Sequence, residues 1–592
     1  MIFVDTETTN EFGKSMTAGR HTLYFGVAEY RRYRSETEDP VIERIEFNAS
    51  ARFWEWVVSK APQGSTLLVL AHNWNFDGAI LEPDTHLKPF GYECSHFIND
   101  GRPPVIISFT CMGKGTIKII DTLNYLTTSV AGLGKSLGHE KLASPGDDAS
   151  DDEWRAYAWR DVEIIRDAYL HLRAFIDDND LGKMPATLAS LSMATYKYRF
   201  MHHDIYVHDR DRVLAMERES YKGGRVECFY VGETEGESLY KYDINSMYPT
   251  VMRNNLYSTA PVKFQRGEKG FEIADGVGYA ADVLIETDLP IYPVRSDVGL
   301  IFPVGEYRTT LSTPELKDAN SRGLIKGVYS YATYDVAPIF VEFVDYFYAA
   351  RRQFQASGNA AFSYMAKILL NSLYGKFGQR GRRWEVSAHD VDTSGITFHS
   401  DEKGGAVIKL RNRFGISQQL MTAPESEESC PIIASEVTGF ARLLLWQFIE
   451  SARAAGGRVY YCDTDSVVTD AAGATALAQY CGGALGQLKL EGEATSAAFY
   501  VAKDYVFGDE VHIKGIRRPE RGVSEYSQDK FTSWAAHLSR DERGFVDIIT
   551  TPKRLTRQYK KAVGEKWVCP IVLENGVAVG PGKRPIPRIQ SA

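Results

Sequence analysis

Residues 461–466, Tyr-Cys-Asp-Thr-Asp-Ser, combine the residue types in this chain that are best suited to chemistry. They lie between two short apolar runs, which predicts the tip of a β-hairpin. Asp463 and Asp465 are two residues apart, so an extended backbone would point both carboxylates to the same side. Two like charges this close repel each other, and a divalent cation is the usual relief. Alone, the motif indicates no more than a solvated turn, so the other acidic residues decide its meaning.

A second acidic set lies nearer the N-terminus and comes from two predicted strand ends and one predicted helix. Its members, in chain order, are Asp5, Glu7, Asp77, Tyr157 and Asp161. Four carboxylates gathered in this way suit two metal ions about 4 Å apart, which activate water and stabilise the leaving oxygen of a phosphodiester. Tyr157 would hold or orient the attacking water. Asp5 and Glu7 by themselves would indicate only a charge pair on an edge strand.

A third group belongs with the hairpin at 461–466. A predicted strand delivers Asp243, the further carboxylate that a metal site beside Asp463 and Asp465 needs, and Pro249 suits the start of the helix that follows. Later in the chain, a predicted helix carries a lysine, an amide and an aromatic ring on one stripe, at Lys367, Asn371 and Tyr374. Such a stripe favours a nucleotide-facing surface, and its alternative is the wet side of an amphipathic helix.

Together these motifs resemble those of family B DNA polymerases. Asp-x-Asn-Ser-Met-Tyr-Pro at 243–249, Lys-x-x-x-Asn-Ser-x-Tyr-Gly at 367–375 and the hairpin at 461–466 are similar to motifs A, B and C. Tyr-Lys-Gly-Gly at 221–224 is similar to the element that joins the nuclease and polymerase domains, and Lys-Asp-Tyr at 503–505 to the element that steadies the primer terminus. The N-terminal set resembles the three motifs of proofreading 3′–5′ exonucleases. The similarity covers roughly residues 1–520.

The resemblance implies a role for each motif residue. The expected metal ligands are Asp243 and Asp465 in the polymerase site and Asp5, Glu7, Asp77 and Asp161 in the exonuclease site, with Asp463 and Tyr157 as supporting catalytic residues. The expected nucleotide-binding residues are Ser246, Tyr248, Arg351, Arg352, Lys367, Asn371 and Tyr374, and which of the two arginines meets the triphosphate stays open. The expected DNA-binding residues are Asn73, Phe76, Tyr221, Gly223, Gly224, Lys503 and Tyr505, together with the basic tail formed by residues 551–592. Whether Lys135 serves the exonuclease also stays open.

The same resemblance implies the cofactor and the substrates. Two Mg²⁺ ions are expected in each active site, with Mn²⁺ as a possible substitute, because Mg²⁺ prefers oxygen ligands and keeps phosphates in its shell. The expected substrates are primer-template DNA and deoxynucleoside triphosphates. A chain of this compact size, with Leu-Gly-Gln-Leu-Lys-Leu-Glu at 485–491, resembles the protein-primed subgroup of bacteriophages and linear plasmids.

Members of that subgroup carry two insertions, one for a terminal priming protein and one for processivity and strand displacement. Residues 302–307 and 313–316 are plausible parts of the first. The alternatives are the same polymerase using an ordinary primer or initiating without one and, more remotely, an exonuclease or replication scaffold alone.

The expected fold is a multidomain α/β and α+β protein, a ribonuclease-H-like exonuclease followed by a right-hand polymerase. We predict seven segments: 1–185 exonuclease, 186–235 connector, 236–337 palm with motif A and a terminal-protein insertion, 338–378 fingers, 379–430 second insertion, 431–520 palm with motif C, and 521–592 thumb.

Bulk properties limit the other classes. Seven cysteines include no Cys-x-x-Cys pair, which argues against a structural zinc site. A net charge of −9 argues weakly against a nucleic-acid partner, but residues 551–592 hold nine Lys and Arg against two Glu. No apolar run approaches the roughly 18 residues of a membrane span. We therefore expect a monomer without a membrane partner, in the cytoplasm of a bacterial host if a phage or plasmid encodes it.

Overall fold

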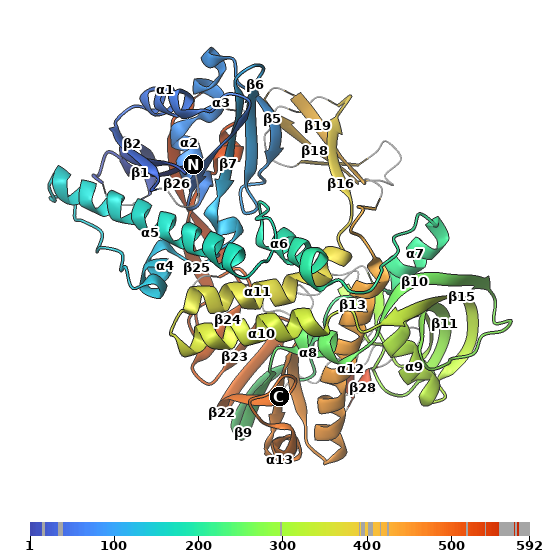
Figure 1. Cartoon of the computed structure of the whole chain (residues 1–592). Helices are drawn as coiled ribbons and strands as arrows, with labels where there is room; N and C mark the ends of the chain where they lie inside the picture. Colours follow the sequence, from blue (N-terminus) through green and yellow to red (C-terminus); the bar gives the residue numbers. More distant parts are fainter. Residues whose placement is uncertain are drawn as a thin grey trace.

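The protein is represented by a computed structural model that describes residues 1–14, 18–33, 39–296, 299–389, 391, 397–400, 407–414, 416–422, 425–516, 519–538, 540, 542–555, 573–574 and 577–578. An N-terminal lobe, a helical pair and a C-terminal lobe follow one another in space, with a smaller sheet beside each lobe (Figure 1). Most of the basic tail predicted to bind DNA lies outside the described residues.

The N-terminal lobe is built on a mixed sheet of nine strands in the described residues. Its centre is β2 (Gly19–Arg32), β1 (Ile2–Thr9), β4 (Ser65–Ala71) and β7 (Gly115–Asp121), in that order. β1 runs parallel to β4 and β4 parallel to β7, so the carboxyl ends of these strands lie together. Outer strands complete the sheet: β6 (Ile106–Cys111), β5 (Glu93–Ile98) and β3 (Val41–Phe47).

Helix α5 (Asp151–Asp178) packs on this sheet against β1 and β2. It begins at Ser150, whose side chain accepts from the amide of Glu153 while the Glu153 carboxylate accepts from the amide of Ser150. This reciprocal capping satisfies two amides that the helix itself leaves unpaired. The acidic first turn, Asp151 to Glu153, lies where the helix dipole favours negative charge. The residues at 150–153 therefore account for where this helix begins.

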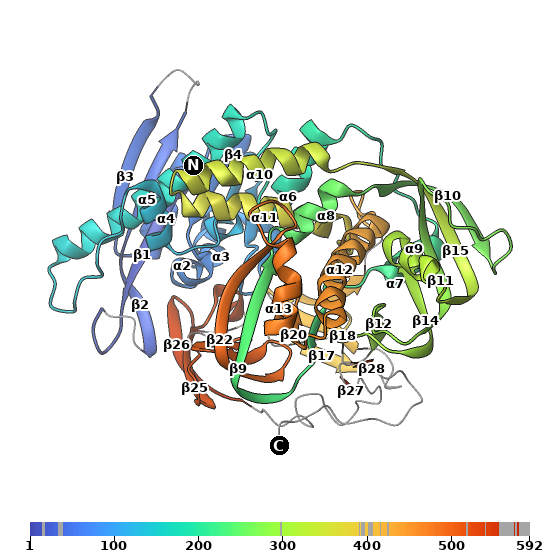
Figure 2. The same ribbon diagram turned by 90° about the horizontal axis from the view of Figure 1, so that it is seen from below.

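Two strands from the far end of the chain complete the N-terminal sheet. β26 (Phe545–Arg554) pairs antiparallel with β2, with His21 opposite Val546, and β25 (Glu525–Phe531) forms the outer edge. Between them, α14 (Trp534–His537) packs Trp534 against Trp74, with ring centroids 6.5 Å apart. Figure 2 shows β25 and β26 beside β2. The segment predicted to be the thumb, 521–592, thus starts as part of the N-terminal sheet.

The C-terminal lobe contains an antiparallel sheet in the order β24-β23-β22-β9-β21-β20-β8. The strands are β8 (Val226–Cys228), β9 (Gly232–Ile244), β20 (Val459–Asp463), β21 (Ser466–Asp470), β22 (Leu488–Val501), β23 (Asp504–Phe507) and β24 (Glu510–Ile513). Helices α12 (Pro431–Ala454) and α13 (Ala471–Leu477) pack against it. By length and composition α12 could cross a membrane, contrary to the sequence analysis, but 78% of its apolar window is buried in the protein.

The helical pair, α10 (Val341–Ala356) and α11 (Ala360–Phe377), lies between the two lobes (Figure 1). α11 packs on α6 (Leu188–Thr195) and α12, and it contacts α4 (Val130–Leu137) of the N-terminal lobe. The turn between the two helices falls at residues 357–359, inside the segment 338–378 predicted as the fingers. The helix that carries the predicted nucleotide-facing stripe is therefore held from several sides.

Two smaller sheets lie where the sequence left room for insertions. One has the order β10-β15-β11-β14, formed by β10 (Tyr257–Arg266), β15 (Ile325–Ala337), β11 (Val277–Thr287) and β14 (Gly305–Ser312), and is followed by α9 (Thr313–Ser321) after β14. The other has the order β16-β19-β18-β17, formed by β16 (Arg382–Val386), β19 (Ile416–Thr422), β18 (Val407–Arg413) and β17 (Thr397–Ser400). The second sheet touches the N-terminal lobe through the rings of Phe97 and Phe414, 5.3 Å apart, and the ion pair of Arg411 with Asp100.

Candidate active sites

The four N-terminal carboxylates predicted as metal ligands line one cavity of about 410 Å³. Asp5 and Glu7 come from alternate positions of β1, Asp77 from α2 (Trp74–Leu81), and Asp161 from α5. Tyr157 lines the same cavity one helical turn before Asp161. Parallel strand ends and a helix laid across the sheet thus bring together side chains that are up to 156 positions apart in sequence.

Burial and mutual repulsion raise the pKa of these acids. Burial, with the charge of Asp161 next in size, raises the pKa of Glu7 to about 8. Burial also raises the pKa of Asp77 to about 7, although Thr6 donates to it from both its hydroxyl, at 2.7 Å, and its amide, at 3.1 Å. The pKa of Asp5 is raised well above its ordinary value by burial and by Asp161. Such a cluster favours a cation or a proton in the cavity.

A lysine that the sequence analysis missed opposes this repulsion. Lys141 forms an ion pair with Asp161, and its Nζ lies 4.2 Å from the ring centre of Tyr157. It lowers the pKa of Glu7 against the effect of burial. Lys141 and Lys14 line this cavity, whereas Lys135, which lies on α4, is not among its lining residues. Lys141 falls in the irregular segment between α4 and α5, where no periodic pattern marks it.

The residues predicted to hold the frayed strand lie at the start of α2. Asn73 has a left-handed backbone with φ of 76°, and its amide donates to the buried Asp121 at 2.9 Å. Asp121, which the sequence analysis did not select, also accepts from the amide of Trp74 at 2.9 Å. Asn73 and Phe76 both line the cavity, and the Phe76 ring packs 5.7 Å from the ring of Phe531 on β25. The C-terminal hairpin therefore supports one wall of this site.

The carboxylates predicted for the polymerase site come from β9, from the last residue of β20 and from the turn between β20 and β21. Asp243 in β9 is paired with Ser466 of β21 on one side and Lys489 of β22 on the other. Beyond it, the amide of Ile244 donates to the carbonyl oxygen of Asp465 at 2.7 Å. The strand pairing thus places Asp243 beside the end of the hairpin that carries the other two acids.

The hairpin turn separates the roles of its two acids. Thr464, between them, has a left-handed backbone with φ of 62°, so the two carboxylates do not simply follow an extended strand. Asp463 accepts from Lys503 Nζ with both oxygens, each at 2.9 Å. The Lys503 amide in turn donates to the Tyr461 hydroxyl at 2.9 Å. The Asp463 carboxylate is therefore held by Lys503, whereas the Asp465 carboxylate interacts with the charge of Asp243.

Asp243 and Asp465 share an acidic environment. Burial, then Asp465, then Glu491 raise the pKa of Asp243 to about 7. The pKa of Asp465 is raised by burial, and Lys367 of α11 lowers both values. Glu491 is a further carboxylate that sequence reasoning did not assign to the site. It is the extra residue of a bulge in β22, between Leu490 and Gly492, and bulges next to active sites re-aim side chains.

Side chains from α8 (Met247–Asn254) and the helical pair face these acids. The rings of Tyr248 and Tyr374 are stacked, with centroids 4.7 Å apart at an angle of 25°. Arg351 Nη1 donates to the Ser246 hydroxyl at 2.9 Å, whereas Arg352 is exposed. Of the two arginines, Arg351 is therefore the one at the nucleotide-binding motif. Lys367 lies on the same helix as Tyr374, with Asn371 half-buried between them.

The Tyr-Lys-Gly-Gly loop packs against both polymerase motifs. A Cβ atom at Gly224 would meet the Thr464 side chain at 3.0 Å and the Tyr248 hydroxyl at 3.1 Å, so only glycine fits without a shift. The buried Arg442 of α12 donates to the carbonyl oxygens of Lys222, at 2.6 Å, and Gly223, at 2.7 Å. The loop is therefore a spacer between motifs A and C.

Two predicted DNA contacts differ from expectation. The Tyr505 ring is buried between Tyr461, 4.7 Å away, and His512, 4.5 Å away, so it supports the strand that leads from Lys503 and presents no exposed face to DNA. The ring of Tyr221 is half-buried, and a Cβ atom at Gly378 would collide with it at 2.5 Å. Both rings act first as packing groups.

The donor sets suit magnesium only in part. Among the described residues, no group of three or more His, Cys, Asp or Glu side chains is arranged to hold a metal ion unaided. The carboxylate oxygens gathered at each site are nevertheless the donors that Mg²⁺ prefers, and Asp161 Oδ1 is buried without a hydrogen-bond partner in the described structure. Mg²⁺ keeps water and substrate phosphates among its ligands, so an incomplete protein shell fits it.

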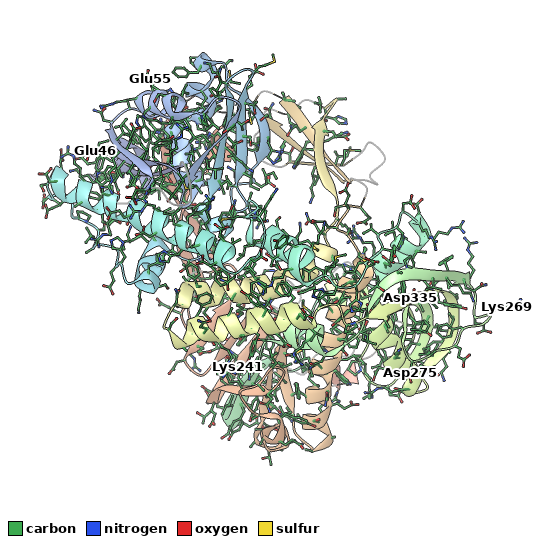
Figure 3. The ribbon with its side chains drawn as sticks, viewed as in Figure 1. Glu46, Glu55, Lys241, Lys269, Asp275 and Asp335 are labelled. Carbon is green, nitrogen blue, oxygen red and sulfur yellow. The ribbon has the colours of Figure 1, made fainter. Side chains whose placement is uncertain are left out.

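The two sites lie in different lobes. Figure 3 labels Glu46 and Glu55 in the N-terminal lobe and Lys241, on the strand that carries Asp243, in the C-terminal lobe. The helical pair lies between them (Figure 1). One chain thus holds two separate acidic centres, each with lysines close to its carboxylates.

Comparison with known proteins shows what this chain is similar to. Residues 139–404, under half of the chain, match the family model for DNA polymerase type B, organellar and viral. A probable DNA polymerase of Podospora anserina is 26% identical over 351 residues, which is 54% of this chain and 28% of that protein. The DNA polymerase of Streptococcus phage Cp-1 is 25% identical over 433 residues, 68% of this chain and 70% of that protein. The chain thus spans under a third of the length of the fungal relative.

Two further relationships bear on the fold and on initiation. The structure of phi29 DNA polymerase with primer-template DNA and incoming nucleotide matches with a TM-score of 0.68 at 17% identity, covering 94% of this chain and 100% of that one. The primer-independent DNA polymerase PolB of Escherichia coli is 25% identical over 428 residues, 60% of this chain and 44% of that protein. The structural match confirms the expected multidomain α/β and α+β fold class, and the sequence matches confirm the motif resemblance.

Proposed function

From the premise that this chain is related to the type B DNA polymerases of organelles and viruses, we propose that it is a template-dependent DNA polymerase with a proofreading 3′–5′ exonuclease. It adds deoxynucleotides to a primer 3′ end in the C-terminal lobe and removes misplaced ones in the N-terminal lobe. The observation that carries the proposal is one acidic centre, in which Asp465 raises and Lys367 lowers the pKa of Asp243, beside the stacked rings of Tyr248 and Tyr374.

In the polymerase site, Asp243 and Asp465 would hold two Mg²⁺ ions, with Glu491 adding negative charge nearby. The chemistry that Mg²⁺ supplies when bound is activation of the primer 3′-hydroxyl and neutralisation of the leaving pyrophosphate. Lys367 and Arg351 meet the triphosphate as cations. Asn371 lines the nucleotide pocket, whose Tyr248–Tyr374 stack bounds the sugar and the nascent base pair.

In the exonuclease site, Asp5, Glu7, Asp77 and Asp161 would hold the metal ions. Tyr157 orients the attacking water, and Lys141 keeps Asp161 ionised and adds a positive charge close to the scissile phosphate. Asn73 and Phe76 contact the terminal nucleotides, with Phe76 braced by Phe531. Metal ions in such a pair activate water and stabilise the leaving oxygen.

We further propose that the enzyme replicates a phage, plasmid or other mobile-element genome, with protein-primed initiation and strand displacement. The sheet β10-β15-β11-β14 is the candidate platform for a terminal protein. The contacts of Phe414 and Arg411 with the N-terminal lobe support the proposal of strand displacement. They hold the second sheet against that lobe, so that a DNA strand could pass beside both. The chain would act as a monomer in the cytoplasm of its host.

Initiation without a protein is the second candidate. The observation that favours it is the similarity over 60% of the chain to a relative named primer-independent. Use of an ordinary primer is a third mode of the same enzyme. A nuclease or scaffold alone is a poor alternative, because both acidic centres keep their full sets of carboxylates.

Primer extension on a long circular template tests these proposals. The reactions contain Mg²⁺ and all four deoxynucleotides, and they compare the wild type, Asp465→Asn and Asp161→Asn, each with and without primer. Products longer than one circle, lost in Asp465→Asn and kept in Asp161→Asn, are the expected result. Synthesis in the primer-free lane would establish unaided initiation. Primer shortening without extension would leave only a nuclease and overturn the proposal.

A further inference from the structure

Arg225 is a buried arginine at the edge of the palm sheet. Its side chain is 1% exposed, and its Nε donates to Glu227 Oε2 at 2.6 Å while Nη2 contacts the same oxygen. Three aromatic rings surround the guanidinium, with Cζ 4.1 Å from the ring centre of Phe302, 4.8 Å from that of Trp446 and 5.5 Å from that of Phe229. A flat cation among rings is attracted by their negative faces, and arginine suits this better than lysine.

The main chain of the same residue holds the catalytic turn. The carbonyl oxygen of Arg225 accepts from the amide of Thr464 at 2.7 Å. Strand β8, which starts at the next residue, pairs with β20, so that Val226 lies opposite Asp463. The fixed side chain and the carbonyl that supports the turn thus belong to one residue.

Thr464 needs such outside support. Its φ of 62° is a conformation that a β-branched residue adopts only when its surroundings impose it. The position of this residue sets where Asp463 and Asp465 point. Displacement of the Arg225 carbonyl would remove the hydrogen bond that the Thr464 amide donates to it.

The guanidinium is in turn fixed from two distant parts of the chain. Phe302 follows β13 (Gly299–Ile301) in the segment between motifs A and B, and Trp446 belongs to α12. Both rings are almost completely buried. The residues around 302 were singled out from sequence as part of an insertion, and here one of them packs beneath the polymerase site.

We propose that the buried Arg225–Glu227 pair is a positioning device for the polymerase carboxylates. By fixing the Arg225 carbonyl, the pair holds Thr464 left-handed and keeps Asp465 directed toward Asp243. Arg225 itself touches neither substrate nor reacting atoms, and the inference rests on the proposed polymerase function of this site. Loss of the pair therefore weakens divalent-cation binding in the C-terminal lobe and leaves the N-terminal cavity unchanged.

Three variants separate positioning from general stability. The double variant Arg225→Met/Glu227→Gln removes both charges, so that neither is left buried and unpaired. Arg225→Lys keeps the charge but loses the planar fork that reaches Glu227 and stacks on Phe302. The matched control is Arg308→Met, because Arg308 also combines an ion pair, with Asp282, and a ring contact, 4.0 Å from Tyr329, but its side chain is 58% exposed.

The measurements are Mn²⁺ affinity by electron paramagnetic resonance, in an Asp161→Asn background, and the Mg²⁺ dependence of primer extension. Exonuclease activity on single-stranded DNA, in the chain with Asp161 intact, reports the other lobe. For the double variant we expect extension about tenfold slower and Mn²⁺ affinity several-fold weaker, the scale of a small misplacement of reacting groups. The extension rate and Mn²⁺ affinity of Arg225→Lys should lie between those of the double variant and the wild type. Arg308→Met should match the wild type in both.

Unchanged Mn²⁺ affinity and extension in the double variant would overturn the inference. Equal losses in both lobes would also overturn it, because they would mark a general loss of folding. If the wild type does not extend a primer at all, the proposed function fails, while the Mn²⁺ affinities still decide whether the pair positions the acids.

Discussion

Glu491, the extra residue of a β-bulge in β22, lies within electrostatic range of Asp243 on the neighbouring strand β9. Burial, Asp465 and then Glu491 raise the pKa of Asp243 to about 7. Without a cation, this carboxyl is protonated in a large fraction of molecules near neutral pH. Metal binding at the proposed polymerase site would therefore be coupled to proton release.

The Mg²⁺ requirement of primer extension should consequently depend on pH. A raised pKa means that the proton is bound below about pH 7 and competes with the metal there. We expect the apparent dissociation constant for Mg²⁺ to rise by up to about tenfold for each unit that the pH falls below 7. Above pH 7 it should level off. Extension rates over a Mg²⁺ series at several pH values measure this. A Mg²⁺ dissociation constant that does not change between pH 6 and 8 would contradict competition between the proton and the metal.

Substitution of Glu491 should move that pH dependence in a defined direction. Glu491→Gln removes a negative neighbour, so the pKa of Asp243 falls and the onset of proton competition shifts to lower pH, by roughly one unit for a single nearby charge. The matched control is Glu493→Gln on the same strand, because Glu493 is not among the charges that raise the pKa of Asp243. Equal shifts in both variants would mean that only net charge matters.

The lysine in the N-terminal cavity should matter for degradation and not for synthesis. Lys141→Met leaves Asp161 without its ion pair, which raises the pKa of Asp161 further and removes a cation from the cavity. We expect exonuclease activity to fall roughly a hundredfold, as for other lost electrostatic groups in active sites. Degradation of labelled single-stranded DNA measures it, with Lys135→Met as the control. Unchanged exonuclease activity in Lys141→Met would show that this lysine has no role in degradation.

The stacked tyrosines should control sugar selection. Tyr248→Val opens space beside the Tyr374 ring where a 2′-hydroxyl would otherwise clash, and we expect ribonucleotide incorporation to rise tenfold or more, the usual scale for a change in pocket size. Tyr374→Phe keeps the ring and serves as control. Single-nucleotide insertion with paired ribo- and deoxynucleotides gives the ratio. An unchanged ratio in Tyr248→Val would assign sugar exclusion elsewhere.

Sequence reasoning found the acids whose spacing within one element is diagnostic. Asp5 with Glu7, Tyr157 with Asp161 and the 461–466 hairpin all depend on local periodicity, which short motifs preserve. Lys141 and Glu491 escaped because one lies in an irregular segment and the other in a bulge, where neither helical nor strand periodicity applies. Tyr505 was assigned to DNA because its motif says nothing about which face of the strand is buried.

The fold was predictable to a similar depth. The order of lobes follows from motif order, and the start of α5 follows from its capping residues and acidic first turn. The return of β25 and β26 to the N-terminal sheet could not be read from sequence, because pairing between strands over 500 positions apart leaves no local signal.

That return also bears on how the molecule is made. As the chain leaves the ribosome, β2 emerges with the edge that β26 will cover still bare, and it stays bare until nearly all of the polymerase half has been synthesised. An open strand edge invites pairing with other chains. Contacts over so great a separation also form late, since the loop they close is long. The N-terminal lobe would therefore complete its folding only after the segments between β2 and β26 have been made.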